Sequence, residues 1–347
     1  MNSPLLDPAC TRMFREASEA GAAVARQVAA NRDAVASLAA ELRGSPPRAI
    51  VTCARGSSDH AATYAKYLFE TRLGILTASA APSVASVYGA TPDLRDCLFV
   101  AISQSGASPD LVATARGARD AGARVVALVN APDSALANAA HYALPLWAGE
   151  ERSVAATKSY IASLAALAHL AAAWTEDRAL GAALEAAPRD LERAWQLDWS
   201  PFVRRLASAS DLYVIARGVG LGVAQEAALK CKETCGLHAE SFSAAEVRHG
   251  PQALLKPAFP ALLLAQADET RAGVEALAAE LASRGIDVFL AGGSAAGAIA
   301  LASIDAHPAI APMLLAQAFY RAANALAIAR GHNPDEPPNL TKVTRTI

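Results

Sequence analysis

The stretch Cys97-Leu-Phe-Val-Ala-Ile-Ser-Gln-Ser-Gly-Ala-Ser-Pro-Asp110 is an apolar run that stops at two serines and a glycine and then opens a second element. Residues 98–102 are expected to form a buried strand, with Ser108 as the N-cap and Pro109 as the first residue of a helix. Free N–H groups of the turn and helix start would then face outward beside the serine hydroxyls and could bind a phosphate without a metal. An ordinary strand-to-helix connection would have the same sequence pattern, so the rest of the sequence must distinguish it from a phosphate-binding turn.

The composition limits the classes of partner. The 347 residues suffice for about two domains. With 31 Lys and Arg against 33 Asp and Glu, the net charge of −2 favours neither nucleic acid nor an anionic membrane as a partner. The apolar stretch 161–174 falls short of the roughly 20 residues that span a bilayer, so it predicts a buried helix. The first residues lack the pattern of a secretion signal, so a cytoplasmic protein is expected.

The five cysteines, at positions 10, 53, 97, 231 and 235, are odd in number and mostly embedded in apolar runs. We expect reduced, packed thiols rather than a disulfide framework. Cys231 and Cys235 lie one helical turn apart, but no histidine or second cysteine pair accompanies them at zinc spacing. The cysteine pattern therefore predicts no metal site.

The chain carries an internal repeat. Residues 50–59 and 212–221 both read as a strand followed by Ala-Arg-Gly, and Arg217 follows Arg55 after 162 residues. The same shift carries Gln104 onto Gln266, which closes a second apolar run. Helix and strand patterns then alternate at 111–120 and 125–130 in the first half, and at 272–283 and 288–291 in the second. This alternation predicts an α/β protein with two doubly wound, flavodoxin-like parallel sheets in tandem.

Breaks in the apolar pattern at residues 44–48 and 195–201 suggest four segments. We expect an N-terminal helical segment (1–43), a first domain with the phosphate-binding turns (44–195), a second domain (196–332) and a C-terminal tail (333–347). Within the helical segment, one face is apolar and should pack against a neighbour: it holds Met13, Ala17, Ala20 and Val24. The prolines of 333–339 exclude a helix, so another part of the protein must order the tail.

The second half holds a charged helix, expected over 223–235 and ended by Gly236. Glu226, Lys230 and Glu233 fall on one face of it. This face could be a solvated surface with intrahelical ion pairs. Its position favours a site instead, because a helix that follows a glycine-rich strand exit in a parallel sheet starts at the ligand crevice. Lys232 lies off this face and is expected to be solvated.

Two further residues are candidates for catalysis. His249 lies in a turn-forming segment, where its imidazole could accept and return a proton near neutral pH, although such histidines are often structural or exposed. The other six histidines have no better sequence context. Lys342 is near the C-terminus, where lysines are usually solvated. A tail folded into an active site could instead desolvate this amine, so that it attacks a carbonyl.

Six segments, in order, resemble the isomerase half of the glucosamine-6-phosphate synthases, which consists of two sugar isomerase (SIS) domains. They are residues 52–58, 103–106, 153–158, 226–233, 248–251 and 339–342. The resemblance implies that the phosphosugar is bound by Gly56, Ser57, Ser58, Ser103, Gln104, Ser105, Ser108, Val154, Ala156 and Thr341. It further implies Glu233 as the proton shuttle between C1 and C2, His249 for ring opening and Lys342 as the tail lysine, which either forms a Schiff base or only stabilises negative charge. Lys230 is expected to stabilise the charge that develops during proton transfer. In that family the histidine comes from the partner subunit, which implies a homodimer with active sites at the interface.

The sequence also departs from these synthases. We expect no glutaminase domain, because Asn2 stands where its cysteine nucleophile would be. Ala156 replaces a serine that contacts the sugar, and Arg55 replaces a cysteine. The pattern resembles stand-alone amino-sugar phosphate deaminases, so we expect glucosamine 6-phosphate to be isomerised and hydrolysed to fructose 6-phosphate and ammonia. We expect this reaction to need no cofactor, because the neighbouring carbonyl acidifies the C2 proton. Three alternatives stay open: an aldose–ketose phosphosugar isomerase, a fructosamine-phosphate deglycase, and a non-catalytic phosphosugar sensor.

Overall fold

The structure, a computed structural model, describes residues 7–90 and 92–342. Its contacts divide the chain into two units. The first unit contains residues 22–151 and 158–188 and the tail from residue 341. The second unit contains the described residues up to 21, the loop 152–157 and residues 189–340.

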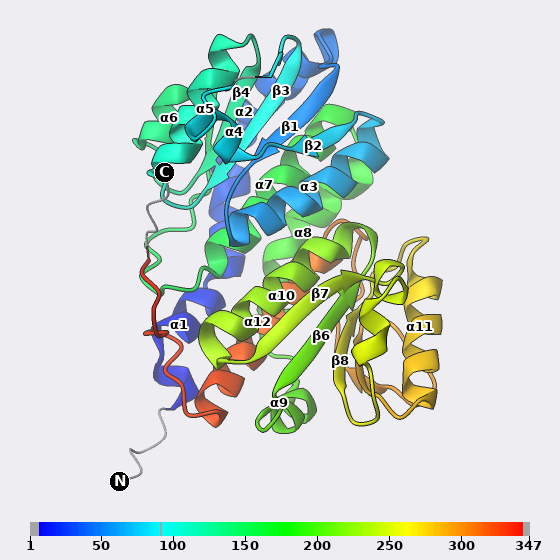
Figure 1. The fold of residues 1–347 in the computed structure, drawn as a ribbon. Helices are drawn as coiled ribbons and strands as arrows, with labels where there is room; N and C mark the ends of the chain where they lie inside the picture. Colours follow the sequence, from blue (N-terminus) through cyan, green and yellow to red (C-terminus); the bar gives the residue numbers. More distant parts are fainter. Residues whose placement is uncertain (1–6, 91, 343–347) are drawn as a thin grey trace. The chain divides into compact units, whose positions relative to one another are not determined.

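The first unit is built on five parallel strands in the order β2-β1-β3-β4-β5 (Figure 1). The strands are β1 (Ala49–Cys53), β2 (Thr77–Ser79), β3 (Cys97–Ser103), β4 (Arg124–Val129) and β5 (Tyr142–Pro145). Its helices are α2 (Ala20–Gly44), α3 (Ser57–Leu73), α4 (Pro82–Ser86), α5 (Pro109–Asp120), α6 (Ala135–Ala139), α7 (Lys158–Thr175) and the first part of α8 (Arg178–Trp195). Helices α3 and α7 pack together on one face of the sheet, while α5 and α6 bury an apolar cluster on the other.

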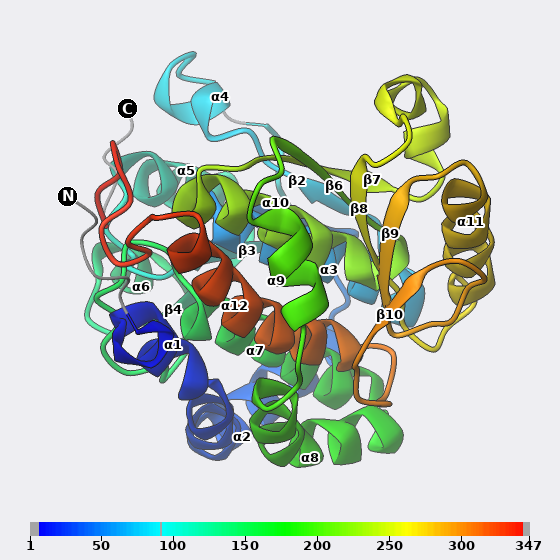
Figure 2. The same ribbon diagram turned by 90° about the horizontal axis from the view of Figure 1, so that it is seen from below.

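The second unit repeats this plan with the strand order β10-β9-β8-β6-β7 (Figure 2). Its strands are β6 (Asp211–Ala216), β7 (His238–Ser243), β8 (Pro260–Leu264), β9 (Asp287–Ala291) and β10 (Ile299–Leu301). Its helices are α1 (Arg12–Ser18), α9 (Ser200–Leu206), α10 (Leu221–Cys235), α11 (Arg271–Ser283) and α12 (Ala311–Ala329). Short 3-10 turns are η1 (Pro8–Cys10), η2 (Gly218–Gly220), η3 (Glu246–Arg248) and η4 (Pro251–Leu254).

Both sheets place their first strand between their second and third. The repeat and the two doubly wound parallel sheets predicted from the sequence are therefore confirmed. In such a sheet the chain leaves the first strand in one direction and returns on its other side, and ligands bind outside the carboxyl ends of the strands at this switch point. In the first sheet the switch point lies between β1 and β3, where both serine-bearing turns begin.

Strand β3 is buried at all seven positions, which confirms the expected strand and extends it by one residue at each end. The helix expected over 161–174 is also confirmed, because α7 covers it and nearly every residue in it is buried. Across residues 7–90 and 92–342, none of the helices has both the length and the apolar character that crossing a bilayer requires.

The N-terminal helical segment differs from the expectation, because it consists of two helices, α1 and α2, with Glu19 between them. Its predicted apolar face is confirmed, since all four residues of that face are fully buried. The tail is ordered by the start of α1. The carboxylate of Asp335 accepts hydrogen bonds from the N–H groups of Arg12 at 2.7 Å and Met13 at 2.8 Å. The first N–H groups of a helix have no acceptor within the helix, so the tail supplies one.

Candidate active site

The turn after β3 is closed by its own serines. Ser103 Oγ accepts a hydrogen bond from the Gly106 N–H at 3.0 Å, and Ser105 Oγ accepts one from the Ala107 N–H at 3.3 Å. The expectation is that free N–H groups of the turn and the helix start face outward, but serine oxygens occupy two N–H groups of the turn. Each serine oxygen that accepts such a bond still has a hydroxyl proton to donate. The turn thus offers hydroxyl donors to an anion in place of those two amides.

Gly106 is required by this turn. Its φ is +61°, and a Cβ there would lie 2.1 Å from Ser134 Oγ. Ser108 has the extended backbone of an N-cap and Pro109 begins α5, as expected, but the Ser108 side chain makes no capping bond. Its half-buried hydroxyl is thus not used by the helix start.

The second serine-bearing turn follows β1. Ser57 and Ser58 are the first residues of α3, after Gly56 with φ +54°. Arg55 connects this turn to the one after β3, because its Nε and Nη2 donate to Asp110 Oδ2 at 3.1 and 2.9 Å. The candidate phosphate ligands of both turns thus belong to one unit, on the two strands that flank the switch point.

In the second unit, α10 carries a buried charge cluster. Lys230 Nζ lies 3.3 Å from Glu226 Oε1 and also donates to Glu233 Oε2. The Lys230 side chain is 0% exposed and that of Glu226 1%, whereas Glu233 is 22% exposed. The alternative of a solvated face is therefore wrong for this side of α10, whereas Lys232 is exposed as expected.

The protonation of Lys230 follows from its neighbours. Burial alone would lower the pKa of this ammonium, but the carboxylates of Glu226 and Glu233 outweigh burial and raise the pKa above its usual value. Tyr320 of α12 donates its hydroxyl to the same oxygen, Glu226 Oε1, at 2.9 Å, so this oxygen of the buried carboxylate has a second partner. Lys230 is thus a cation at neutral pH and holds Glu233 in place.

A cavity of about 340 Å³ lies beside Glu233. Its walls come from α10, from the end of the chain after α12 and from the tail: Leu229, Lys232, Glu233, Gly236, His332, Pro338 and Leu340. His332 was not singled out from the sequence, because its position after a long helix gives no sign that the chain turns back onto α10. The predicted acid–base residue His249 is exposed and does not line this cavity.

Lys342 makes a specific contact within the first unit. Its Nζ lies 3.4 Å from Glu151 Oε2, and the side chain is 23% exposed. The fully buried Glu151 also accepts hydrogen bonds from the N–H and hydroxyl of Ser159. The described part of the tail therefore places its lysine on a buried carboxylate rather than in solvent. Thr341, the other tail residue expected at the site, is exposed.

Val154 and Ala156, both half-buried, lie in the loop 152–157 of the second unit. Glu16 of α1 fixes this loop, because its carboxylate accepts the N–H groups of Arg152 at 2.7 Å and Ser153 at 3.0 Å. These two candidates, Lys230, Glu233 and His249 belong to the second unit, and the other candidates belong to the first.

The switch point of the second sheet holds a buried glutamine side chain. Gln266, which corresponds to Gln104 in the repeat, is buried there, and its Nε2 donates to the Arg217 carbonyl, to Asp268 Oδ2 and to Thr270 Oγ1. A Cβ on Gly220 would lie only 2.6 Å from Gln266 Oε1. At the second switch point this amide is thus bonded to its own surroundings, and residues 217–220 and 265–270, which follow β6 and β8, include no serine.

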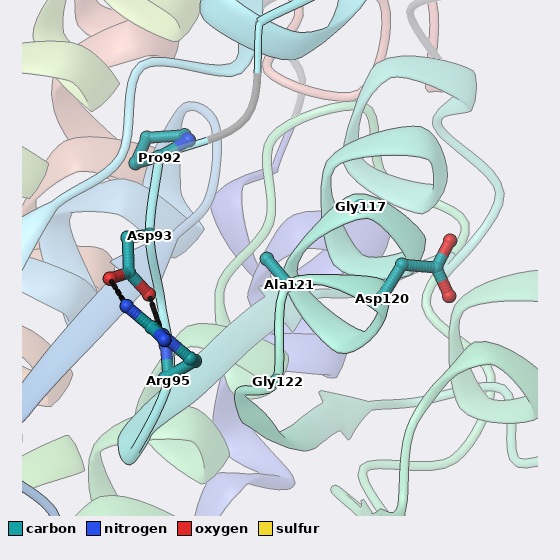
Figure 3. A pocket seen from close by; sticks show the side chains of 7 residues that line it. All are labelled: Pro92, Asp93, Arg95, Gly117, Asp120, Ala121 and Gly122. Carbon is teal, nitrogen blue, oxygen red and sulfur yellow. Dashed lines mark hydrogen bonds and ion pairs between the residues drawn. The ribbon is translucent and has the colours of Figure 1, made fainter.

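Another cavity, of about 710 Å³, lies before β3 and at the end of α5, at the opposite end of the first sheet from the switch point (Figure 3). Its charged groups satisfy one another, since Arg95 donates to both oxygens of Asp93 while Asp120 points away from this pair. In the described residues, no three His, Cys, Asp or Glu side chains are grouped so that they could hold a metal ion. The four cysteines at positions 53, 97, 231 and 235 are free and buried, and Cys10 is free but exposed.

Comparison with known proteins assigns the family. The family model described as the SIS domain matches residues 45–173 and again residues 205–329, one match on each sheet. The chain belongs to the SIS-domain family. This membership confirms the resemblance found in the sequence, and the tandem arrangement agrees with the two repeated sheets.

Individual relatives of this SIS protein support the same assignment. A structure from Silicibacter pomeroyi DSS-3, provisionally assigned as a phosphosugar isomerase, is 43% identical and covers 94% of this chain and 100% of its own, with a TM-score of 0.90. The isomerizing glutamine–fructose-6-phosphate aminotransferase of Aeropyrum pernix is 35% identical over 309 residues, which are 83% of this chain and 49% of that protein. The chain thus spans about half the length of the curated relatives it matches. The glucosamine-6-phosphate deaminase structure from Thermotoga maritima shares the fold, with 22% identity, a TM-score of 0.77 and coverage of 97% and 100%.

Proposed function

We propose that this SIS-family phosphosugar isomerase is a glucosamine-6-phosphate deaminase. The observation that carries the proposal is the α10 cluster, in which a buried lysine holds Glu233 at the wall of a cavity. An isomerase needs such a carboxylate, because one base must take a proton from C2 and return it to C1. A glucosamine-6-phosphate deaminase structure shares this fold over 97% of the chain, so the fold accommodates such a reaction.

The reaction uses the residues in a defined order. The sugar opens to its aldehyde, and the carboxylate of Glu233 removes the C2 proton, which the neighbouring carbonyl acidifies. The same carboxylate returns the proton to C1, so that the enolamine becomes a C2 imine. Water then adds to C2 and ammonia leaves, giving fructose 6-phosphate. Lys230, which stays protonated, stabilises the negative charge that develops during proton transfer.

The test is an assay of the purified chain with glucosamine 6-phosphate and no glutamine, in which ammonia and fructose 6-phosphate are both measured. We expect equal amounts of the two products. Glu233→Gln keeps the shape of the side chain but removes the base, and should lower kcat by about 100-fold or more. Glu240→Gln, at an exposed position of β7, is the matched control and should keep full activity.

The outcomes separate the candidate functions. Interconversion of fructose 6-phosphate with an aldose phosphate, without ammonia, would make the chain a simple isomerase. Consumption of a fructosamine phosphate alone would make it a deglycase. Phosphosugar binding without turnover would make it a sensor. Full activity of Glu233→Gln would refute the proton-shuttle assignment.

We also propose a homodimer in which His249 acts in the partner's site. Its exposure, away from the cavity beside Glu233 of its own chain, supports this role. Mixing inactive Glu233→Gln and His249→Asn chains should restore activity, because one of the two sites in a mixed dimer would hold both native residues. If the two inactive variants stay inactive after mixing and refolding, the proposed role of His249 in the partner's site is contradicted.

A further inference from the structure

Arg55 joins the two turns that carry the candidate phosphate ligands. It lies between β1 and α3, directly before Gly56, and its guanidinium donates two hydrogen bonds to Asp110 Oδ2. Asp110 belongs to the first turn of α5, directly after the serine turn of β3. The Arg55–Asp110 pair therefore connects the two strand exits at the switch point of the first sheet, where α/β proteins of this topology bind their ligands.

The two members of the pair are buried to very different extents. The Asp110 side chain is 0% exposed, whereas that of Arg55 is 48% exposed. The other carboxylate oxygen, Asp110 Oδ1, accepts a hydrogen bond from the N–H of Leu111 at 2.8 Å, so both oxygens of this carboxylate are held. The buried carboxylate therefore orients the half-exposed guanidinium of Arg55, whose positive charge remains accessible to solvent.

The guanidinium retains binding capacity in this position. The two bonds to Asp110 use the Nε–H and one N–H of Nη2, which are two of the five donors of an arginine. Planar pairs of N–H donors match the oxygens of a phosphate, and such bonds to a charged group are stronger than those from neutral hydroxyls. The serine turns supply neutral hydroxyl donors, so Arg55 adds the positive charge that they lack.

The surroundings make this charge necessary. Asp59, in the first turn of α3, is another carboxylate at the same strand exit. Burial raises the pKa of Asp59, while His60 and Arg55 act in the opposite direction, so Arg55 lies close enough to stabilise the charged carboxylate. Without Arg55, a phosphate would approach a site that holds two acidic groups and no compensating arginine.

We propose that Arg55 is a specificity-determining residue that binds the substrate's phosphate group together with the serine turns, and that Asp110 is the positioning residue that holds Arg55. The proposal deepens the proposed function, because it rests on a phosphosugar bound at this switch point. It assigns a role to a position at which the sequence departs from the synthases.

The experiment compares Arg55→Gln with the native chain by calorimetric titration with inorganic phosphate and by steady-state kinetics with glucosamine 6-phosphate. We expect the Kd for phosphate and the KM to rise about 10-fold or more, with kcat within about 2-fold, because a contact made equally in the ground and transition states affects only binding. Asp110→Asn should raise both constants by a smaller factor. The matched control is Arg72→Gln, which breaks an Arg–Asp pair at the far end of α3 and should change neither constant.

Three results would overturn the proposal: an unchanged phosphate Kd in Arg55→Gln, a fall in kcat at unchanged KM, or an equal effect of Arg72→Gln. If Arg55→Gln does not fold, the same measurements on Arg55→Lys test the proposal. It keeps the charge but loses the planar fork, so it should weaken phosphate binding several-fold, and an unchanged Kd would overturn the proposal. A native chain that binds phosphate through Arg55 but releases no ammonia would refute the deaminase function and leave this inference standing.

Discussion

Removal of the buried cation of α10 is the most direct test of the candidate site. In Lys230→Met the ammonium is lost, while Glu226 stays 1% exposed and keeps only the Tyr320 hydroxyl among the contacts described above. Coulomb attraction across the 3.3 Å separation is roughly 5 kcal/mol at an effective dielectric constant of about 20. Breaking a buried pair on one side typically costs about 3–5 kcal/mol, because a buried charge is left uncompensated. We therefore expect the free energy of unfolding to fall by about 3–5 kcal/mol.

The assay is urea unfolding followed by fluorescence and circular dichroism, with Lys232→Met as the control from the exposed side of the same helix. The loss should be larger at pH 8 than at pH 5, because a buried carboxylate that has lost its cation is tolerated better once it is protonated. Adding Glu226→Gln should restore part of the stability. A loss below about 1 kcal/mol, or no difference between the two pH values, would refute the reasoning.

In the native chain the same cluster sets a limit at alkaline pH. The folded state raises the pKa of Lys230 above its ordinary value of 10.5. The stability that this group contributes is therefore fully present below about pH 10.5 and is lost as the pH rises through the higher folded value.

Three further predictions concern positions away from this cluster. Gly106→Ala should lower stability by about 2–5 kcal/mol, since φ is +61° and a serine side chain fills the space, whereas Gly181→Ala, in open space on α8, should be neutral or stabilising in thermal unfolding. Asp335→Ala should cost about 1 kcal/mol and speed hydrogen exchange at the first two amides of α1, and unchanged exchange would contradict the account of how the tail is held. Burial and, next, the charge of Asp110 raise the pKa of the Cys53 thiol to about 12, so a thiol reagent at pH 8 should modify the exposed Cys10 and leave Cys53 intact in the folded protein.

Local signals in the sequence were sufficient to predict the fold. Strand β3 and helix α5 are encoded by an apolar run, a turn and a proline, and the repeat from Arg55 to Arg217 made the second sheet a copy of the first. The break between α1 and α2 was missed, because the apolar face continues across Glu19 and leaves the helical periodicity intact.

The candidate site was predictable only in part. The spacing of Glu226, Lys230 and Glu233 placed them on one face, but spacing cannot distinguish a buried face from a solvated one. Contacts made across long stretches of chain carry no such pattern. Examples are the Tyr320 hydroxyl on Glu226 and the side chain of His332 in the cavity wall, both of which depend on how α12 packs against α10.

The side chain of Gln266 in the second switch point has a consequence for the number of ligands. Two copies of one fold could in principle hold two phosphosugars. At the switch point of the second copy, however, the Gln266 amide is already bonded to Arg217, Asp268 and Thr270. Titration should therefore saturate at one phosphosugar per chain. We therefore expect the duplication to preserve the architecture in both halves and the affinity for ligand in only one of them.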